Sequence, residues 1–569
     1  MNADFFLNPK NNLHKKYEAL RASYVDGLSD EDVAEKFGFT YFSFKSIKRD
    51  LKHAIETDFF IQPMPRGKSQ SRSQSEEHVI ELRKRNYSVD EIKEKLQKEY
   101  QLDISTTTIS NILDKEGFTK LFRRTFRERM EAMQQEQNYA ERSSIMEFAK
   151  YPSATTSFGG IFLFAPLMME LGLDKLFELP LYGSKQIPVQ NYLLSYLCVK
   201  LLGCERLYHC SNYNFDYALG GFTGLNVLPK PSTLASFSYR HDTRTVKKLL
   251  KGFTKKMYAN GWIKGKNINL DFHSIPYFGD TSEIERNWVA TRGKRMKSIL
   301  SLFAQDLDTT FLCYSNGDIR QGEQNDEVLR FIEYYRETTG ILPERLIFDS
   351  KLTTYKNLNE LNQQGIKFIA LGRRGPDFSK KVENVSEWTK IKLDNVKRKY
   401  SELLCFEKNS HIIDYKDEIR EVFVKGNGRE LPMRLFTNDK VSSLKQVITY
   451  YSHRWRIENN IAENIDFFNL NSLQSPVIVQ VNFDIVMTLI ANSLYKILAK
   501  KIRWFEDATP KTISRKFVNI ETQINITDDE LVVQYKKNTY NPMIKDWVTG
   551  LPDTKISWLG NRKLIFEFL

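Results

Sequence analysis

Two groups of three helix-length segments open the sequence. In the first group, apolar residues recur every three or four positions over residues 13–24, 29–37 and 40–51, with Gly27 and Gly38 between the segments. This spacing predicts three short amphipathic helices joined by glycine-containing turns. A short helix, a tight turn and a second helix are typical of the helix-turn-helix unit of DNA-binding proteins. Residues 1–61 are therefore predicted to be a DNA-binding unit.

The same pattern returns after a polar stretch. Residues 76–85 form one amphipathic segment, and Ser88 and Ser105 stand where they can cap two more helices. We predict a second helix-turn-helix unit over residues 76–130 and a flexible basic linker over residues 62–75. The candidate DNA contacts in and after these units are Lys45, Lys48, Arg49, Arg123 and Arg124.

The middle of the chain changes from helical to strand-like patterns. Residues 131–262 are mostly helical and apolar in pattern, and we expect them to serve packing or dimerisation. Three strand-like runs follow, and then helices alternate with strands. This order predicts a mixed sheet with parallel βαβ units, as in a ribonuclease H-like core. The predicted strands are Ile268–Phe272, Ser298–Asp306, Thr310–Tyr314, Arg345–Phe348 and Lys367–Leu371, and the helices are Glu327–Thr338 and Tyr355–Gln364.

A polar, β-patterned stretch interrupts this core. Residues 376–440 predict an inserted β subdomain, which divides the core into residues 263–375 and residues 441–500. A long helix over residues 443–468 begins the second part, and residues 501–569 form a C-terminal region with a strand pair. The fold class is therefore multidomain α+β and α/β: a ribonuclease H-like core with an inserted β subdomain, preceded by helical DNA-binding domains.

Composition adds a basic charge and disfavours two classes of protein. The 569 residues include 84 Lys and Arg against 71 Asp and Glu, a net charge of +13, which favours a polyanionic partner. The longest strongly apolar run, Phe158–Met169, is shorter than the roughly 20 residues of a membrane span, and no secretory signal is recognisable. We predict a cytoplasmic protein with no membrane partner.

One cysteine cluster invites a zinc interpretation. Cys198, Cys204, His209 and Cys210 lie close together in the sequence. Their segment lacks a Cys-x-x-Cys pair and has the pattern of an apolar helix. Buried thiols are therefore the preferred interpretation.

Three acidic residues stand where the predicted core would bring side chains together. Asp271 closes the first strand, Asp349 follows the fourth strand, and Glu458 lies on the long helix. Carboxylates are the ligands that Mg²⁺ prefers, and two such ions can catalyse phosphodiester chemistry. The alternative is structural, because an Asp at a strand end often only begins a turn.

The helix around Glu458 favours the catalytic interpretation. At about 100° per residue, Tyr451 lies within about 20° of Glu458, and Arg454 lies about 60° from Tyr451. An aromatic ring, a guanidinium and a carboxylate therefore share one helix face. Arg454 could form an ordinary salt bridge with Glu458 or hold a DNA phosphate. Glu463, the nearest other acidic residue, lies about 140° round the helix.

These residues carry a resemblance to a known family. Asp271, Asp349 and Glu458, with Tyr-x-x-Arg-Trp-x-Ile-Glu at 451–458, resemble the DDE transposases of bacterial insertion sequences. Within them, the chain resembles the hairpin-forming group, which carries a β insertion before the catalytic Glu. The resemblance covers about residues 150–500. It implies that the three carboxylates are catalytic and bind two Mg²⁺ ions, for which Mn²⁺ can substitute.

The resemblance also implies partners and a reaction course. The partners are double-stranded DNA, as transposon ends and as target, and a second copy of the chain in a homodimer that joins the two ends. The course is excision by strand nicking, hairpin formation and hairpin opening, followed by strand transfer into the target.

One position departs from the group's signature. The signature continues with a DNA-gripping Lys seven residues after Glu458, where this chain has Ile465. The candidates to supply this contact are Lys351, Arg373 and Arg374.

Three aromatic or basic side chains complete the expected DNA contacts. Tyr451 and Arg454 belong to the signature itself. Relatives stack a flipped base on an aromatic residue of the β insertion, and Trp388 is the candidate by size and position. A core position of the β subdomain is the alternative for Trp388.

The sequence thus predicts a DNA transposase that binds the terminal inverted repeats of its element and catalyses metal-dependent excision and strand transfer. Two other functions stay open. One is a sequence-specific DNA-binding regulator with a degenerate nuclease core, which would not need to keep the three carboxylates. The other is a structure-specific nuclease of the same fold, which would not need two helix-turn-helix units.

Overall fold

The computed structural model divides the chain into residues 1–77 and residues 78–569, and each unit is described here by itself. The described residues are 12–53, 70–84, 87–115, 118, 153–178, 187–213, 215–239, 241–279, 284–320, 322–373, 378, 382, 385, 387–393, 401–428, 431–473 and 475–569. Residues 62–69 of the predicted linker lie outside this set, as do Arg123, Arg124 and Arg374.

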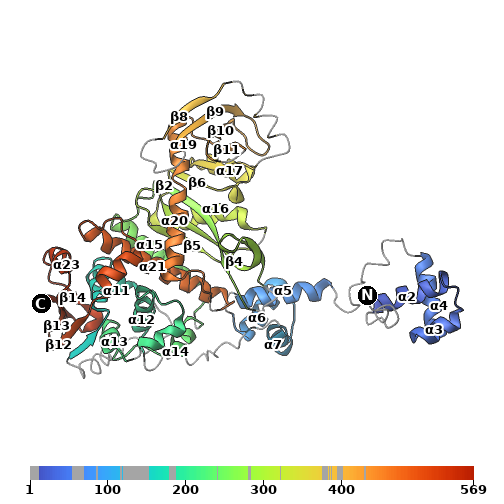
Figure 1. Ribbon diagram of the computed structural model, residues 1–569, viewed down its shortest axis with the longest axis horizontal. Helices are drawn as coiled ribbons and strands as arrows, with labels where there is room; N and C mark the ends of the chain where they lie inside the picture. Colours follow the sequence, from blue (N-terminus) through green and yellow to red (C-terminus); the bar gives the residue numbers. More distant parts are fainter. Residues whose placement is uncertain are drawn as a thin grey trace. The chain divides into compact units, whose positions relative to one another are not determined.

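The helices of the first unit follow the predicted pattern. They are α2 (Asn12–Tyr24), α3 (Asp30–Phe37) and α4 (Tyr41–His53) (Figure 1). The Ser29 hydroxyl caps α3 by accepting a 3.2 Å hydrogen bond from the Asp32 N–H. Gly38 ends α3 with a left-handed φ of 64°, which glycine adopts without strain. The apolar faces of the three helices form one small core of their own.

A second helical group follows, with α5 (Gln70–Lys84), α6 (Val89–Tyr100) and α7 (Thr106–Lys115). Ser88 and Glu91 form a capping box at the start of α6, with hydrogen bonds of 3.3 and 2.8 Å. A 3.1 Å ion pair between Glu81 and Arg320 joins α5 to the core. One prediction is corrected: α5 begins at Gln70, so residues 70–75 are helical rather than linker, since no Pro or Gly interrupts them.

The core of the second unit is a ten-stranded sheet in the order β3-β4-β2-β6-β7-β11-β10-β9-β8, with β5 paired to β4. Strands β4, β5 and β2 pair antiparallel, whereas β2, β6 and β7 pair parallel. The order β5-β4-β2-β6-β7 is that of the predicted mixed sheet and fits a ribonuclease H-like core. The strands of its first half are β2 (Asn267–Pro276), β3 (Arg286–Val289), β4 (Lys294–Asp306), β5 (Leu312–Asn316), β6 (Arg345–Phe348) and β7 (Lys367–Leu371).

The predicted β insertion is not a separate sheet. Its strands are β8 (Thr389–Lys392), β9 (Glu402–Ser410), β10 (Ile419–Lys425) and β11 (Met433–Thr437). Strand β11 pairs antiparallel with β7 from Leu435 to Leu371, so the insertion extends the core sheet (Figure 1). The inserted strands are therefore attached to the core, because β11 completes the edge of β7 that would otherwise be exposed.

The predicted long helix is two helices. They are α19 (Leu444–Ser452) and α20 (Trp455–Phe468), and a turn at His453 and Arg454 separates them (Figure 1). Helix α20 packs against β2 and β4, and α21 (Ile478–Lys501) packs against β5. The remaining core helices are α16 (Glu327–Thr339) and α17 (Tyr355–Gln363), with the single turns η4 (Ala290–Arg292), η5 (Gln324–Asp326) and η6 (Ser350–Leu352).

The region before the core and the C-terminal region form one structure, although the sequence predicts two. Their strands β1 (Ser153–Thr156), β12 (Thr522–Ile526), β13 (Glu530–Tyr535), β14 (Lys555–Ile556) and β15 (Arg562–Phe568) form a five-stranded sheet in which β1 pairs with β12. The two regions pack closely at Gly160, where a Cβ would lie 1.8 Å from the Phe517 carbonyl oxygen.

Short helices surround this second sheet and α21. They are η2 (Gly159–Leu163), α10 (Phe164–Glu170), α11 (Leu173–Leu176), α12 (Val189–Leu201), η3 (Leu207–Tyr213), α13 (Tyr217–Phe222), α14 (Pro231–Ser238), α15 (Thr243–Ala259), α22 (Pro510–Ile513), η7 (Ser514–Val518), α23 (Asn541–Val548) and η8 (Ser557–Leu559). Among the described helices, α21 is the one long and apolar enough to cross a membrane, but 94% of its apolar window is buried inside the protein, as in a core helix.

Candidate active site

Two aspartates lie on neighbouring parallel strands at the same edge of the core sheet. Leu270 of β2 pairs with Phe348 of β6, and Asp271 and Asp349 are the next residues of the two strands. Each carboxylate also accepts a hydrogen bond from the following backbone N–H, of 3.0 Å for Asp271 and 2.6 Å for Asp349. The strand register therefore holds both carboxylates in place.

Asp271 does not close its strand as predicted. Strand β2 continues to Pro276, and its pairing with β4 continues to Ser298. The strand is longer than its apolar run because β4 supplies hydrogen-bond partners beyond Asp271.

Arg454 links the first aspartate to the glutamate of α20. Its guanidinium donates to Asp271 Oδ2 at 3.2 Å and to Glu458 Oε1 at 2.5 Å. The Tyr451 ring lies 5.9 Å from the same guanidinium. The Arg454 side chain is 16% exposed and that of Asp271 14%, whereas Glu458 is 49% exposed. The structure thus brings together the aromatic, basic and acidic residues of the sequence signature.

The three carboxylates give the site a negative charge, which Arg454 balances in part. Burial raises the pKa of Asp271 to about 6; Arg454 lowers this pKa, while Glu458 and Asp349 raise it. Burial by itself would lower the pKa of Arg454, but Asp271 and the other acidic neighbours raise it above its ordinary value. The three carboxylates therefore lie within electrostatic range of one another and of Arg454.

The donor set fits a hard divalent cation. Carboxylate oxygens are the ligands that Mg²⁺ and Mn²⁺ take, and the Arg454 guanidinium now occupies a cation position between Asp271 and Glu458. Within the described part of the chain, no three acidic, His or Cys side chains converge as ligands of one ion. Two ions shared by three carboxylates do not need such convergence, since each ion can take two carboxylates and further oxygens from DNA or water.

Part of the chain that contains this site matches a known protein family. Residues 310–493 match the transposase DDE domain family. The match begins after Asp271 and includes Asp349 and Glu458, so it covers two of the three carboxylates. No curated protein matches the chain. The family match supports a DDE transposase, an enzyme that acts on DNA.

Two buried amides hold the turn that places Arg454 and Glu458. Asn269, on β2, donates to the His453 carbonyl at 3.4 Å, and Gln305, on β4, donates to the Arg456 carbonyl at 3.3 Å. Both amides are fully buried. These hydrogen bonds tie the turn at His453 and the first turn of α20 to the core sheet. Sequence reasoning missed both residues, although a polar amide inside an apolar strand was a signal.

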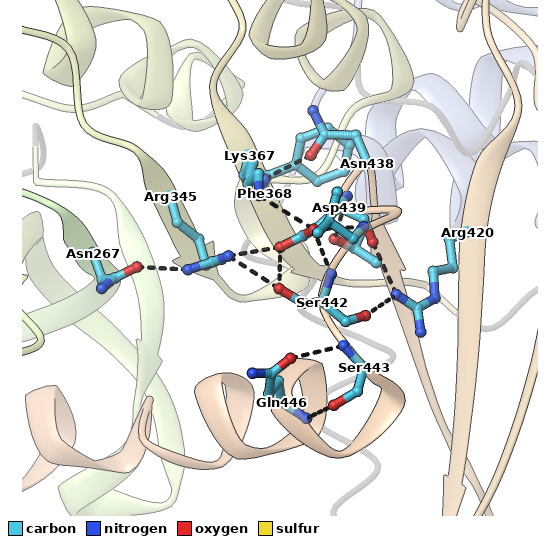
Figure 2. A network of polar contacts seen from close by, with 12 residues as sticks. Asn267, Arg345, Lys367, Phe368, Arg420, Asn438, Asp439, Ser442, Ser443 and Gln446 are labelled. Atoms are coloured by element: carbon cyan, nitrogen blue, oxygen red, sulfur yellow. Dashed lines mark hydrogen bonds and ion pairs between the residues drawn. The ribbon is translucent and has the colours of Figure 1, made fainter.

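A polar network anchors the start of α19 (Figure 2). Asp439 accepts a 2.6 Å hydrogen bond from Arg345, which also donates to Asn267 at 2.8 Å. Arg420 donates to the Ser442 carbonyl at 2.7 Å. Burial would raise the pKa of Asp439, but hydrogen bonds from Ser442 and Arg345 lower it below its ordinary value. The network connects β6, the insertion and the helix that leads to the site.

Two basic residues predicted to contact DNA lie beside Asp349. Lys351 follows it in η6, and its ammonium lies 5.9 Å from the Phe272 ring. Arg373 donates to the Ser350 carbonyl at 3.3 Å. Both side chains are exposed, so they border the site.

Trp388 is placed within the β insertion. Its ring lies 6.3 Å from Phe406 and 4.1 Å from the Lys425 ammonium. It packs against a small apolar cluster formed by Phe378, Val382 and Phe423. This packing fits the core interpretation, and base stacking on Trp388 stays a prediction.

Three further predictions meet the structure in different ways. Lys45 and Arg49 are exposed on α4, and Lys48 is partly exposed and forms a 2.7 Å ion pair with Asp30 on α3, so DNA contact by these residues stays a prediction. Ile465 packs partly buried against the core. Glu463 faces Lys496 instead of the three carboxylates: burial raises its pKa and Lys496 opposes this effect.

The cysteines near residue 200 are thiols in an apolar setting. Cys198, Cys204 and Cys210 are buried. Burial raises the pKa of Cys204 to about 11 and that of Cys210 to about 12, which favours the neutral thiol.

Proposed function

We propose that this protein is a cut-and-paste DNA transposase. In this proposal it binds the terminal inverted repeats of its element, excises the element and joins it to target DNA. The observation that carries the proposal is the cluster of Asp271, Asp349 and Glu458 around Arg454, two of whose carboxylates lie in the matched DDE domain. The N-terminal helices α2–α4 and α5–α7 support end binding through their helix-turn-helix pattern.

Asp271, Asp349 and Glu458 would hold two Mg²⁺ ions in this proposal. Bound Mg²⁺ or Mn²⁺ would activate the attacking oxygen and stabilise the leaving oxygen of the phosphodiester. Glu458 and Asp349 both raise the pKa of Asp271, so Asp271 is close to each of them. We therefore expect Asp271 to be the ligand that the two ions share.

The basic side chains around the carboxylates would position the DNA. Arg454 has a fork of donors, and a phosphate can replace the carboxylates that the fork now contacts. Lys351 and Arg373 lie next to Asp349, where they can replace the Lys that Ile465 does not supply. Tyr451 packs beside Arg454 and limits its side-chain freedom.

Hairpin intermediates and a synaptic homodimer belong to the same proposal. The strands β8–β11 lie between Asp349 and Glu458 in the chain, as in hairpin-forming transposases, and this order supports the hairpin route. Trp388 is half-buried in this insertion and stays the candidate to stack a flipped base.

The test is metal-dependent nicking of a plasmid that carries the gene with its flanking DNA. Asp271→Asn, Asp349→Asn and Glu458→Gln should each keep the fold and end binding. Each variant should nick DNA more slowly than the wild type by a factor of about 10² or more, because misplaced reacting groups can cost this factor. Glu463→Gln is the matched control, since it faces Lys496. Specific end binding by a wild-type protein that never nicks would instead favour the DNA-binding regulator.

A further inference from the structure

A β-hairpin beyond the active site has a concentrated basic charge. Strands β3 and β4 form it, and residues 284–297 include five Arg or Lys and one Glu. Within the described residues, none of these five basic side chains forms an ion pair. They are Arg286, Arg292, Lys294, Arg295 and Lys297.

The strand register gathers three of these cations and a tryptophan on one face. Arg286 pairs with Lys297, and Trp288 pairs with Arg295, so the four side chains point to the same side of the hairpin. Trp288 is 54% exposed. Like charges directly opposite each other destabilise a strand pair, and here no described acidic partner relieves the Arg286–Lys297 pair. A local cost of this kind is typical of a functional surface.

The opposite face of the hairpin is used for packing. Val289 is fully buried, and Asn287 donates a 3.2 Å hydrogen bond to the Ser298 carbonyl. These contacts hold the hairpin, so the basic face is not needed for its attachment.

The basic face continues the sheet face that carries Asp271. Asp271 pairs with Phe303 of β4, and every second residue of β4 from there shares its face. At about 3.3 Å per residue, Lys297 lies roughly 20 Å and Arg295 roughly 26 Å along the strand from Phe303. These lengths correspond to about six to eight steps of 3.4 Å along a DNA strand.

We propose that Arg286, Trp288, Arg295 and Lys297 bind duplex DNA that extends from the active site. The three cations contact backbone phosphates about six to eight base pairs from the phosphate at the carboxylates, and Trp288 packs against the same backbone. The inference rests on the proposed transposase function and assigns a surface to its substrate. The duplex is the element end with its flank, whose phosphate lies at the carboxylates when it is nicked.

The first experiment measures the salt dependence of binding by the full chain. The probe is a fluorescein-labelled 40-base-pair duplex from the DNA flanking the gene. The variant Arg286→Gln/Arg295→Gln/Lys297→Gln should lower the slope of log affinity against log salt by about 2.7, or about 0.9 for each lost phosphate contact. The control Arg515→Gln/Lys537→Gln/Lys555→Gln removes three exposed cations elsewhere and should keep the slope.

Thermal unfolding separates a DNA contact from a structural role. Arg286→Gln removes a like-charge pair, so its melting temperature should equal or exceed that of the wild type. If the triple variant binds DNA less well only because its melting temperature falls, the hairpin is structural and the proposal is wrong.

The second experiment locates the duplex. A photo-cross-linking benzoylphenylalanine replaces Trp288 in the full chain. It is tested with a plasmid carrying the flanked gene, and with pre-cleaved ends plus a supercoiled target plasmid. Cross-links six to eight base pairs from the nick in the first probe support the proposal, whereas cross-links to the target plasmid alone would overturn it. If neither DNA is cross-linked and the salt slope is that of the wild type, the proposal fails. Nicking by the wild type but not by Asp349→Asn would then still support the transposase function.

Discussion

The ionised Asp271 carboxylate destabilises the metal-free folded protein, and a substitution that removes its charge tests this conclusion. Burial raises the pKa of Asp271 from its ordinary value of 3.8 to about 6. Ionisation of the Asp271 carboxyl is therefore less favourable in the folded protein than in the unfolded chain. We predict that Asp271→Asn makes the metal-free protein more stable at pH 8 while it abolishes nicking.

The magnitude follows from the pKa. One pKa unit corresponds to about 1.4 kcal/mol, so the ionised carboxylate costs about 3 kcal/mol at pH 8. This cost already includes the attraction of Arg454, which lowers the pKa of Asp271. We therefore expect a net gain of about 3 kcal/mol in the free energy of unfolding at pH 8.

The pH dependence fixes the sign of the effect. A carboxyl whose folded pKa is raised favours folding at low pH, and this benefit is lost as the pH rises from about 4 to about 6. The measurement is urea unfolding in EDTA at pH 5 and pH 8, with the exposed Asp528→Asn as control. The gain of Asp271→Asn should fall at pH 5 by about 1.4 kcal/mol, roughly half of the ionisation cost. A variant less stable than the wild type at pH 8, or a gain that does not change with pH, would refute the reasoning.

Three other predictions concern residues outside the carboxylate cluster. Lys48→Ala should lower the free energy of unfolding of residues 1–77 by about 0.5–1 kcal/mol, since it removes the ion pair with Asp30, whereas Lys45→Ala should not; urea unfolding of the first unit reports both. Asp439→Ala should lower the free energy of unfolding of residues 78–569 by about 3–5 kcal/mol in urea at pH 7, because it leaves buried Arg345 without its carboxylate. The pKa of Asp439 is lowered, so this difference is complete above about pH 4 and should shrink as the pH falls further. Trp388→Ala should lower the melting temperature and leave the first nick unchanged, which gel assays of plasmid nicking would show.

Local sequence patterns predict the centre of the core well. The structure has β6 over Arg345–Phe348 and β7 over Lys367–Leu371, the same bounds as the sequence predicts. Buried parallel strands are continuous apolar runs between polar residues, so their limits are visible in the sequence. Asp349 directly follows such a run, and its place at the sheet edge is predictable for the same reason.

Features that depend on distant partners are not predictable in this way. The helical period is continuous across His453, whereas the structure has a turn there that is tied to the sheet by Asn269 and Gln305, which lie 184 and 151 residues from their carbonyl partners. Lys48 has the pattern of an exposed helix residue, but Asp30 on another helix captures it. The union of the insertion with the core sheet likewise depends on pairing between β11 and β7.

Strand β2 and helix α20 position the site with different rigidity. Nine consecutive residue pairs fix β2 against β4, so a slip of one residue would turn Asp271 to the other face of the sheet. Glu458 is instead placed by a turn that two amide hydrogen bonds of 3.3 and 3.4 Å hold. Breaking those bonds costs far less than shifting a paired strand. We therefore expect binding of metal and DNA to release Arg454 from Asp271 and to move Glu458 toward Asp271 and Asp349, while the two aspartates stay in place.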